Sequence, residues 1–88
     1  MSDVTVNYND GRPQESLTYG ERAVGISFNP DGNTDVAIIK RRFAKAIDAL
    51  AELRDATTEG EVKRMLSIAI TDAQSAQMWA VKAATWGL

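Results

Sequence analysis

The chain has 88 residues, and its 10 Lys and Arg residues against 12 Asp and Glu residues give a formal net charge of −2 at pH 7. With 44% hydrophobic and 25% charged residues, the composition is that of one small globular domain and excludes disorder throughout. The chain contains no cysteine and no histidine, which excludes thiolate nucleophiles, imidazole bases and the usual zinc ligands. We therefore expect a protein that is not an enzyme, and its acidic balance argues against binding to DNA or RNA polymers.

Residues 1–18 are rich in polar and turn-forming residues and are predicted to form a flexible or extended arm. Within it, Val4, Val6 and Tyr8 alternate with polar residues as in a short strand, although the segment offers no second strand for pairing. The start of the chain lacks the basic and apolar regions of a secretory signal, and no apolar run approaches the roughly 20 residues of a membrane-spanning helix. These features predict a cytoplasmic protein without membrane contact.

Residues 19–88 are predicted to form a helical-hairpin domain that follows the arm. Val24, Ile26 and Phe28 alternate with smaller residues, which predicts an extended segment that lays one apolar face on a larger element. Residues 29–32 (NPDG) then have the preferences of a type I turn. The extended segment should therefore end at this turn, just before the first long helix.

Two long helices are predicted, over about residues 35–56 and 59–85. Apolar residues recur every three or four positions in both, Asn33 or Thr34 can cap the first, and Thr58 and Glu61 form a capping-box pattern at the start of the second. Gly87 is placed to end the second helix. Because the connection is short, the helices must pack antiparallel. The fold class is therefore all-α: an antiparallel two-helix hairpin with an extended N-terminal arm.

The second helix has more apolar surface than a hairpin can bury. A second apolar stripe lies outside the seam that faces the first helix, and it contains Met65, Ile68, Met78, Trp79, Val81 and Trp86. Residues 22–28 could fold back over part of this stripe, but a self-complementary surface between protomers explains the whole of it better. Since a domain of this size buries only about 60% of its unfolded surface, we predict a homo-oligomeric helical bundle.

Three polar side chains are candidates for binding an anionic ligand. Lys40 should lie at the edge of an apolar groove, and Arg64 lies in the first turn of the second helix, where free backbone amides attract negative charge. Thr71 lies two turns later on the same side. The alternatives are a salt bridge from Arg64 to Glu61 or Glu59, and a bond from Thr71 to its own helix backbone. Tyr19, Phe28 and the two tryptophans are the rings that could stack on a base.

The sequence resembles the helical-hairpin domain shared by phage anti-CBASS and anti-Thoeris sponge proteins. The matching segments are 19–22 (YGER), 28–30 (FNP), 32–33 (GN), 36–40 (VAIIK), 63–69 (KRMLSIA) and 76–82 (AQMWAVK). Proteins of that family assemble into oligomers, typically hexamers, and sequester cyclic nucleotide or related immune signals without cleaving them. The resemblance therefore implies an anti-defence sponge that binds cyclic di- or trinucleotides and requires no cofactor or metal.

The resemblance also assigns ligand-binding residues. Arg64, in a pattern that continues through Thr71, Asp72, Met78 and Lys82, matches the arginine of the family's cyclic trinucleotide pocket. Lys40 matches a lysine that contacts a cyclic dinucleotide phosphate, and Phe28 or Tyr19 would take the place of the family's base-stacking tyrosine. The alternative is a helical oligomeric interaction protein that inhibits a host or phage protein through its tryptophan face.

Overall fold

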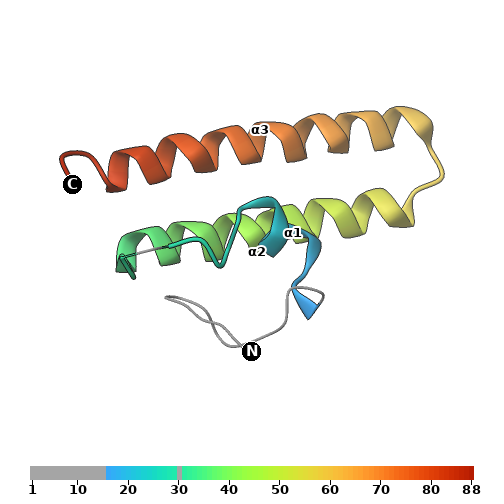
Figure 1. The fold of residues 1–88 in the computed structure, drawn as a ribbon. Helices are drawn as coiled ribbons and strands as arrows, with labels where there is room; N and C mark the ends of the chain where they lie inside the picture. The colour runs from blue at the N-terminus through green and yellow to red at the C-terminus, as the bar shows by residue number, and fades with distance from the viewer. Residues whose placement is uncertain (1–15, 30) are drawn as a thin grey trace.

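The structure, a computed structural model, describes residues 16–29 and 31–88 and contains three helices. They are α1 (Tyr19–Ala23), α2 (Thr34–Ala56) and α3 (Gly60–Ala84). The helices α2 and α3 lie side by side and antiparallel, and α1 packs against α2 (Figure 1). The predicted all-α hairpin is confirmed. The predicted arm, with its candidate strand at residues 4–8, lies outside the described residues except for residues 16–18.

Residues 24–27 form turns where an extended segment was predicted, and the short helix α1 lies just before them. Thr18 and Glu21 form a capping box, in which the Glu21 backbone N–H donates to Thr18 Oγ1 at 3.1 Å and the Thr18 N–H donates to Glu21 Oε1 at 2.9 Å. The helix α1 ends at Ala23, with Val24 as its C-cap, and Gly25 follows with φ +64°. Val24 and Ile26 are buried, as their apolar character predicts. They point inward because the backbone turns at residues 24–27, and not because side chains alternate along a strand.

A glycine allows α1 to lie close against α2. The Gly20 backbone N–H donates to Asp48 Oδ1 at 2.7 Å, and a Cβ at Gly20 would lie only 2.2 Å from the carbonyl oxygen of Ala44. No side chain fits at that distance, so the contact requires glycine. This contact fixes α1 and the turn after it over the middle of α2.

An asparagine pair forms the start of α2. Asn29 is buried; its side-chain N–H donates to the Asn33 carbonyl at 2.9 Å, and its side-chain oxygen accepts from the Asn33 N–H at 3.1 Å. The Gly32 N–H donates to the Asn29 carbonyl at 2.9 Å, which closes the predicted turn. Asn33 then caps α2 by accepting from the Val36 N–H at 3.0 Å, so Asn33 rather than Thr34 is the cap.

The predicted capping box at the start of α3 is wrong. The helix begins at Gly60 with Glu59 as its N-cap, and no side chain caps it. The Glu61 carboxylate pairs with Arg64 instead of reaching back to the backbone of Thr58. An arginine one turn later offers the carboxylate a charge-assisted hydrogen bond, which is stronger than a bond to a neutral backbone N–H.

The hydrophobic core lies where α1 and its following turn cover the α2–α3 pair. Ile47 is fully buried at its centre, and the cluster around it comprises Leu17, Val24, Ile26, Ala44, Ala51 and Ile70. Within residues 16–29 and 31–88, no helix is long and apolar enough to cross a membrane. The core is small, as expected for a hairpin of this length.

The face of α3 that points away from α2 is exposed and apolar. Trp79 is 69% exposed and Trp86 is 80% exposed, and Met65 and Ile68 are also exposed. Residues 22–28 therefore do not cover the two tryptophans, and that alternative is wrong for this part of the stripe. We name Met65, Ile68, Trp79 and Trp86 the outer face of α3.

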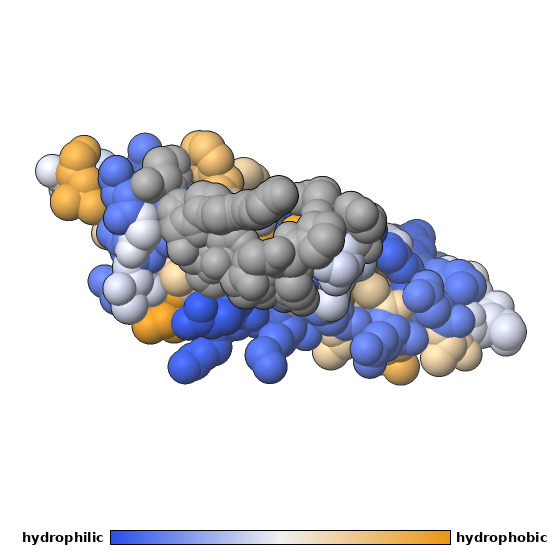
Figure 2. All heavy atoms as spheres, turned by 60° about the horizontal axis from the view of Figure 1, so that its bottom comes forward, coloured by the Kyte–Doolittle hydropathy of each residue, from blue (hydrophilic) through white to orange (hydrophobic). Residues whose placement is uncertain are grey.

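The α2 side of the molecule has a different surface. Figure 2 looks onto this side and shows a row of hydrophilic side chains with separate hydrophobic residues among them. On α2, the basic residues Arg41, Arg42 and Lys45 are all exposed. These side chains form the solvated face of the helix, opposite the core.

Candidate functional site

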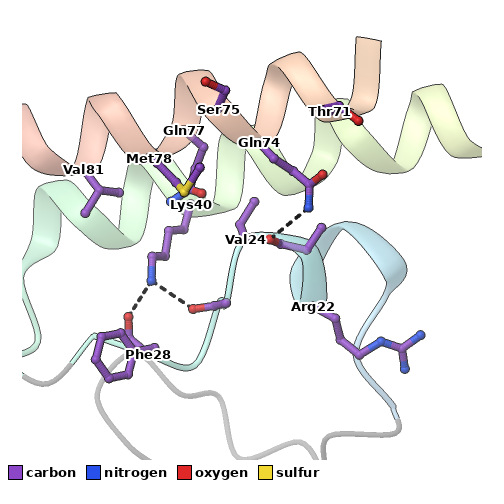
Figure 3. A pocket seen from close by; sticks show the side chains of 12 residues that line it. Arg22, Val24, Phe28, Lys40, Thr71, Gln74, Ser75, Gln77, Met78 and Val81 are labelled. Atoms are coloured by element: carbon purple, nitrogen blue, oxygen red, sulfur yellow. Dashed lines mark hydrogen bonds between the residues drawn. The ribbon is translucent and has the colours of Figure 1, made fainter. Parts of the chain in front are cut away.

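A cavity of about 690 Å³ lies between the turn after α1, the first half of α2 and the second half of α3 (Figure 3). Cavities that hold small-molecule ligands measure roughly 300–1,000 Å³. The residues that line it are Arg22, Ala23, Val24, Gly25, Phe28, Lys40, Thr71, Gln74, Ser75, Gln77, Met78 and Val81. The cavity therefore combines apolar walls with a small set of polar groups.

Lys40 carries a positive charge into this cavity from α2. It is only 6% exposed, and its ammonium donates to the carbonyl oxygens of Gly25 at 2.9 Å and Phe28 at 2.5 Å. Burial lowers the pKa of Lys40 from its ordinary value of 10.5, because desolvation disfavours the charged form. An ammonium has three N–H donors, so one remains for a ligand after the two carbonyls are bonded.

The electrostatics of the cavity favour an anion. Among the described residues that line it, none is acidic, whereas Lys40 and Arg22 are both basic. The Arg22 side chain extends away from Lys40 in Figure 3, so Lys40 is the cation that the fold holds in place. A fixed ammonium in a partly desolvated cavity attracts phosphate more strongly than an exposed lysine does.

Phe28 provides an aromatic ring beside this charge. The ring is 73% exposed, and its centroid lies 5.5 Å from Lys40 Nζ. Phe28 also lines a second hollow of about 330 Å³, which lies between the start of α2 and the C-terminal end of the chain. An exposed ring beside a cation can stack on a base while the cation binds a phosphate.

Polar side chains of α3 form the opposite wall. Thr71 is exposed, and its hydroxyl group is available at the cavity surface. The Gln74 side chain donates to the Ala23 carbonyl at 3.5 Å, a contact that joins α3 to the end of α1. Gln77 is 5% exposed and also lines the cavity. Sequence reasoning missed Gln77, although a polar residue at a core-facing position between Ala73 and Ala80 was the available signal.

The other two predicted site residues lie elsewhere. Tyr19 is at the start of α1, where its ring centroid lies 5.7 Å from the guanidinium carbon of Arg54. Arg64 is exposed at the start of the second turn of α3 and forms an ion pair with Glu61, one of the alternatives that the sequence left open. This pairing lowers the pKa of Glu61 and raises that of Arg64. In the single chain, the structure brings together Phe28, Lys40 and Thr71, but not Tyr19 or Arg64.

The fold and the cavity define a small helical-hairpin protein with a cationic, partly apolar binding cavity. A family profile described as "Acb2/Tad1, hairpin domain" matches residues 21–85, which include α2, α3 and every residue that lines the cavity. The chain therefore belongs to the Acb2/Tad1 hairpin-domain family, whose members are phage anti-defence sponge proteins that bind nucleotide signals. The predicted resemblance is confirmed.

Comparison with curated proteins and with solved structures gave no significant match. The family assignment therefore depends on the profile match, which covers most of the chain.

Proposed function

We propose that this protein captures a cyclic di- or trinucleotide immune signal and holds it intact, so that CBASS-type effectors in the cytoplasm of the infected host cell are not activated. In this proposal the protein is a binder and not an enzyme, and it uses no cofactor. The observation that carries the proposal is the buried ammonium of Lys40 in a cavity that has no acidic side chain among its described lining residues. Family membership supplies the class of ligand.

The chemistry of the cavity suits this ligand class. A cyclic dinucleotide has two phosphates and two flat bases, so it needs a fixed cation, an aromatic ring and apolar walls. Lys40, Phe28 and Met78 provide one of each. A sponge must also bind tightly: a nanomolar Kd corresponds to roughly −12 kcal/mol, whereas one exposed ion pair contributes at most about 1 kcal/mol. Most of the affinity must therefore come from enclosure of the ligand.

Enclosure is the reason that the proposal includes a homo-oligomer, which the resemblance puts at a hexamer. The outer face of α3 leaves two tryptophans largely exposed, an arrangement that marks an interaction surface in small proteins. A second copy of the chain on this face would bury the rings and could bring Arg64 of one subunit toward a ligand held by another. The oligomer should be visible as a concentration-independent mass in native mass spectrometry at micromolar protein.

The central test is calorimetry with cyclic di-AMP, cyclic di-GMP and cyclic tri-AMP as probes. We expect tight binding of at least one of them, and recovery of the unchanged nucleotide when the protein is denatured. A folded oligomer that gives no heat with any of the three, or a nucleotide recovered in cleaved form, would contradict the proposal.

Substitutions test which residues bind. Lys40→Met and Arg64→Ala should each weaken binding while leaving the mass of the assembly unchanged. Lys45→Ala is the matched control, because Lys45 is an exposed lysine of the same helix that lies outside the cavity. Equal affinities for all four proteins would remove both residues from the binding site.

The exposed tryptophans favour one other candidate function, inhibition of a host or phage protein that binds the outer face of α3. This function predicts a single stoichiometric protein partner and no response to nucleotides. Substitution of both Trp79 and Trp86 by Ser would then abolish partner binding, whereas the sponge function predicts that it disrupts the homo-oligomer.

A further inference from the structure

Gln77 differs from the other buried polar side chains of the structure. Asn29, Lys40 and Gln77 are all more than nine-tenths buried. Asn29 bonds to the backbone of Asn33, and Lys40 bonds to two carbonyl oxygens. Within the part of the chain that the structure describes, the Gln77 amide has no hydrogen-bond partner. A buried amide without a partner destabilises a fold by about 1–3 kcal/mol, so its retention calls for an explanation.

The position of Gln77 supplies a reason. It lines the same cavity as Lys40, and its side chain descends from α3 toward Lys40 (Figure 3). On the same wall Met78 and Val81 are apolar, Thr71 is exposed, and Gln74 donates to the Ala23 carbonyl. Gln77 is therefore the buried polar group of this mixed wall, on the side of the cavity opposite Phe28.

We propose that Gln77 is the residue that reads the base of the bound nucleotide, an inference that rests on the proposed function. A carboxamide presents one donor, its NH₂ group, beside one acceptor, its carbonyl oxygen. The Watson–Crick edge of adenine presents the complementary pair, a donor at N6 beside an acceptor at N1, and guanine presents an acceptor at O6 beside a donor at N1. In this arrangement Lys40 binds a phosphate, Phe28 stacks on a base, and Gln77 hydrogen-bonds to a base edge.

Two substitutions separate this role from a structural one. Gln77→Met keeps the length and shape of the side chain but removes both hydrogen-bonding groups, so it should weaken binding of cyclic di-AMP and of cyclic di-GMP about tenfold or more. Gln77→Glu replaces the donor with a second acceptor. A carboxylate still pairs with guanine, which has adjacent N–H donors at N1 and N2, but it meets the adenine N1 acceptor. The ratio of cyclic di-AMP to cyclic di-GMP affinity should therefore fall about tenfold for Gln77→Glu.

The melting temperature of the ligand-free protein also separates the two roles, because a binding role and a structural role predict different changes in it. If the amide is held for a ligand, Gln77→Met removes an unpaired buried polar group, and the melting temperature of the ligand-free protein should stay the same or rise. If Gln77 is a structural residue with a protein partner, the same substitution should lower the melting temperature. A lowered melting temperature would overturn the inference even in a protein that binds nucleotides.

The experiment distinguishes the two levels of the proposal. It uses the full chain, with calorimetry against cyclic di-AMP and cyclic di-GMP and thermal unfolding for wild type, Gln77→Met and Gln77→Glu. Wild-type protein that binds neither probe would overturn the base-reading role together with the proposed function for these ligands. Tight wild-type binding with an unchanged affinity ratio in Gln77→Glu, or undiminished affinity in Gln77→Met, would overturn the base-reading role alone. Weakened binding in Gln77→Met, the shifted ratio and an undiminished melting temperature together support it.

Discussion

The two ends of the α2–α3 interface are built from different side chains. Toward the loop that joins the helices, the buried residues of the interface are apolar, with Ile47 fully buried and Ile70 2% exposed. Toward the start of α2, Val36 and Ala37 are buried together with two polar residues, Lys40 and Gln77, which line the cavity. Apolar burial stabilises a fold, whereas buried polar groups stabilise it only when they are partnered. The apolar end should therefore carry most of the stability of the hairpin, whereas the polar end contains the candidate binding site.

The largest effect should come from the apolar end. Ile47→Ala removes the most buried side chain of the core and leaves a cavity, which should lower the free energy of unfolding by about 4 kcal/mol. Urea unfolding at fixed protein concentration measures this loss. The matched control is Ile38→Ala on the same helix, where the side chain is 37% exposed and the loss should be about 1 kcal/mol. Similar losses for the two variants would show that stability is not concentrated at this end.

The close contact between α1 and α2 should give the next largest effect. A methyl group at Gly20 would collide with the Ala44 carbonyl, so Gly20→Ala should lower the free energy of unfolding by about 3 kcal/mol. Gly60→Ala is the control, because nothing lies within 4 Å of a Cβ there and α3 should become slightly more stable. If Gly20→Ala unfolds like wild type, α1 does not pack on α2 as the structure has it.

The fold shows which local signals were strong enough to predict structure. The spacing of apolar residues was sufficient for the two long helices. It was not sufficient for α1, which has only five residues and whose Gly20 disfavours a helix in isolation. The short helix exists because Gly20 permits contact with α2, and a contact between distant residues cannot be seen in a local pattern.

A motif that occurs twice also shows that a local pattern does not decide its own structure. The Thr-x-x-Glu pattern occurs at Thr18 and at Thr58, and only the first forms a capping box. The difference lies outside the motif, because Arg64 stands one turn after Glu61 and binds its carboxylate. At Thr58 the pattern forms no cap, and the Glu61 carboxylate that a cap would use is paired with Arg64.

The candidate site was predicted in part, for a comparable reason. Lys40 could be predicted because a cation next to core-facing residues is unusual in a sequence, and the structure places it beside Phe28 at a cavity that Thr71 also lines. Gln77 was not predicted, because a single amide among the alanines that face α2 does not by itself indicate a binding role. Its proposed role depends on the cavity that Gln77 lines together with the turn after α1, and a local sequence pattern does not show that cavity.

At the polar end, the loss of Lys40 should be moderate for stability and severe for binding. Lys40→Met leaves the carbonyls of Gly25 and Phe28 without their donor, which should lower the free energy of unfolding by about 2 kcal/mol. Hydrogen exchange should rise in residues 24–28, and calorimetry should show weaker nucleotide binding. The control is Lys45→Met. Lys45 is exposed on the same helix, so its substitution should change none of these quantities. A variant that keeps full affinity would place the ligand away from this end of the interface.

The smallest effect should come from the exposed ion pair between Glu61 and Arg64, near the start of α3 and outside the buried interface. Arg64 lowers the pKa of Glu61 below its ordinary value of 4.5, so the pair favours the folded state above that pH, and its contribution is lost as the pH falls through the lowered pKa. Both side chains are exposed, and water and salt screen the attraction. Glu61→Gln should therefore leave the melting temperature at neutral pH unchanged. If Arg64 contacts the ligand in the assembled protein, the same substitution removes the carboxylate that competes for it, and nucleotide affinity should be equal to that of wild type or higher. Weaker binding in Glu61→Gln would show instead that Glu61 holds Arg64 in its binding position, so that the ion pair belongs to the binding site.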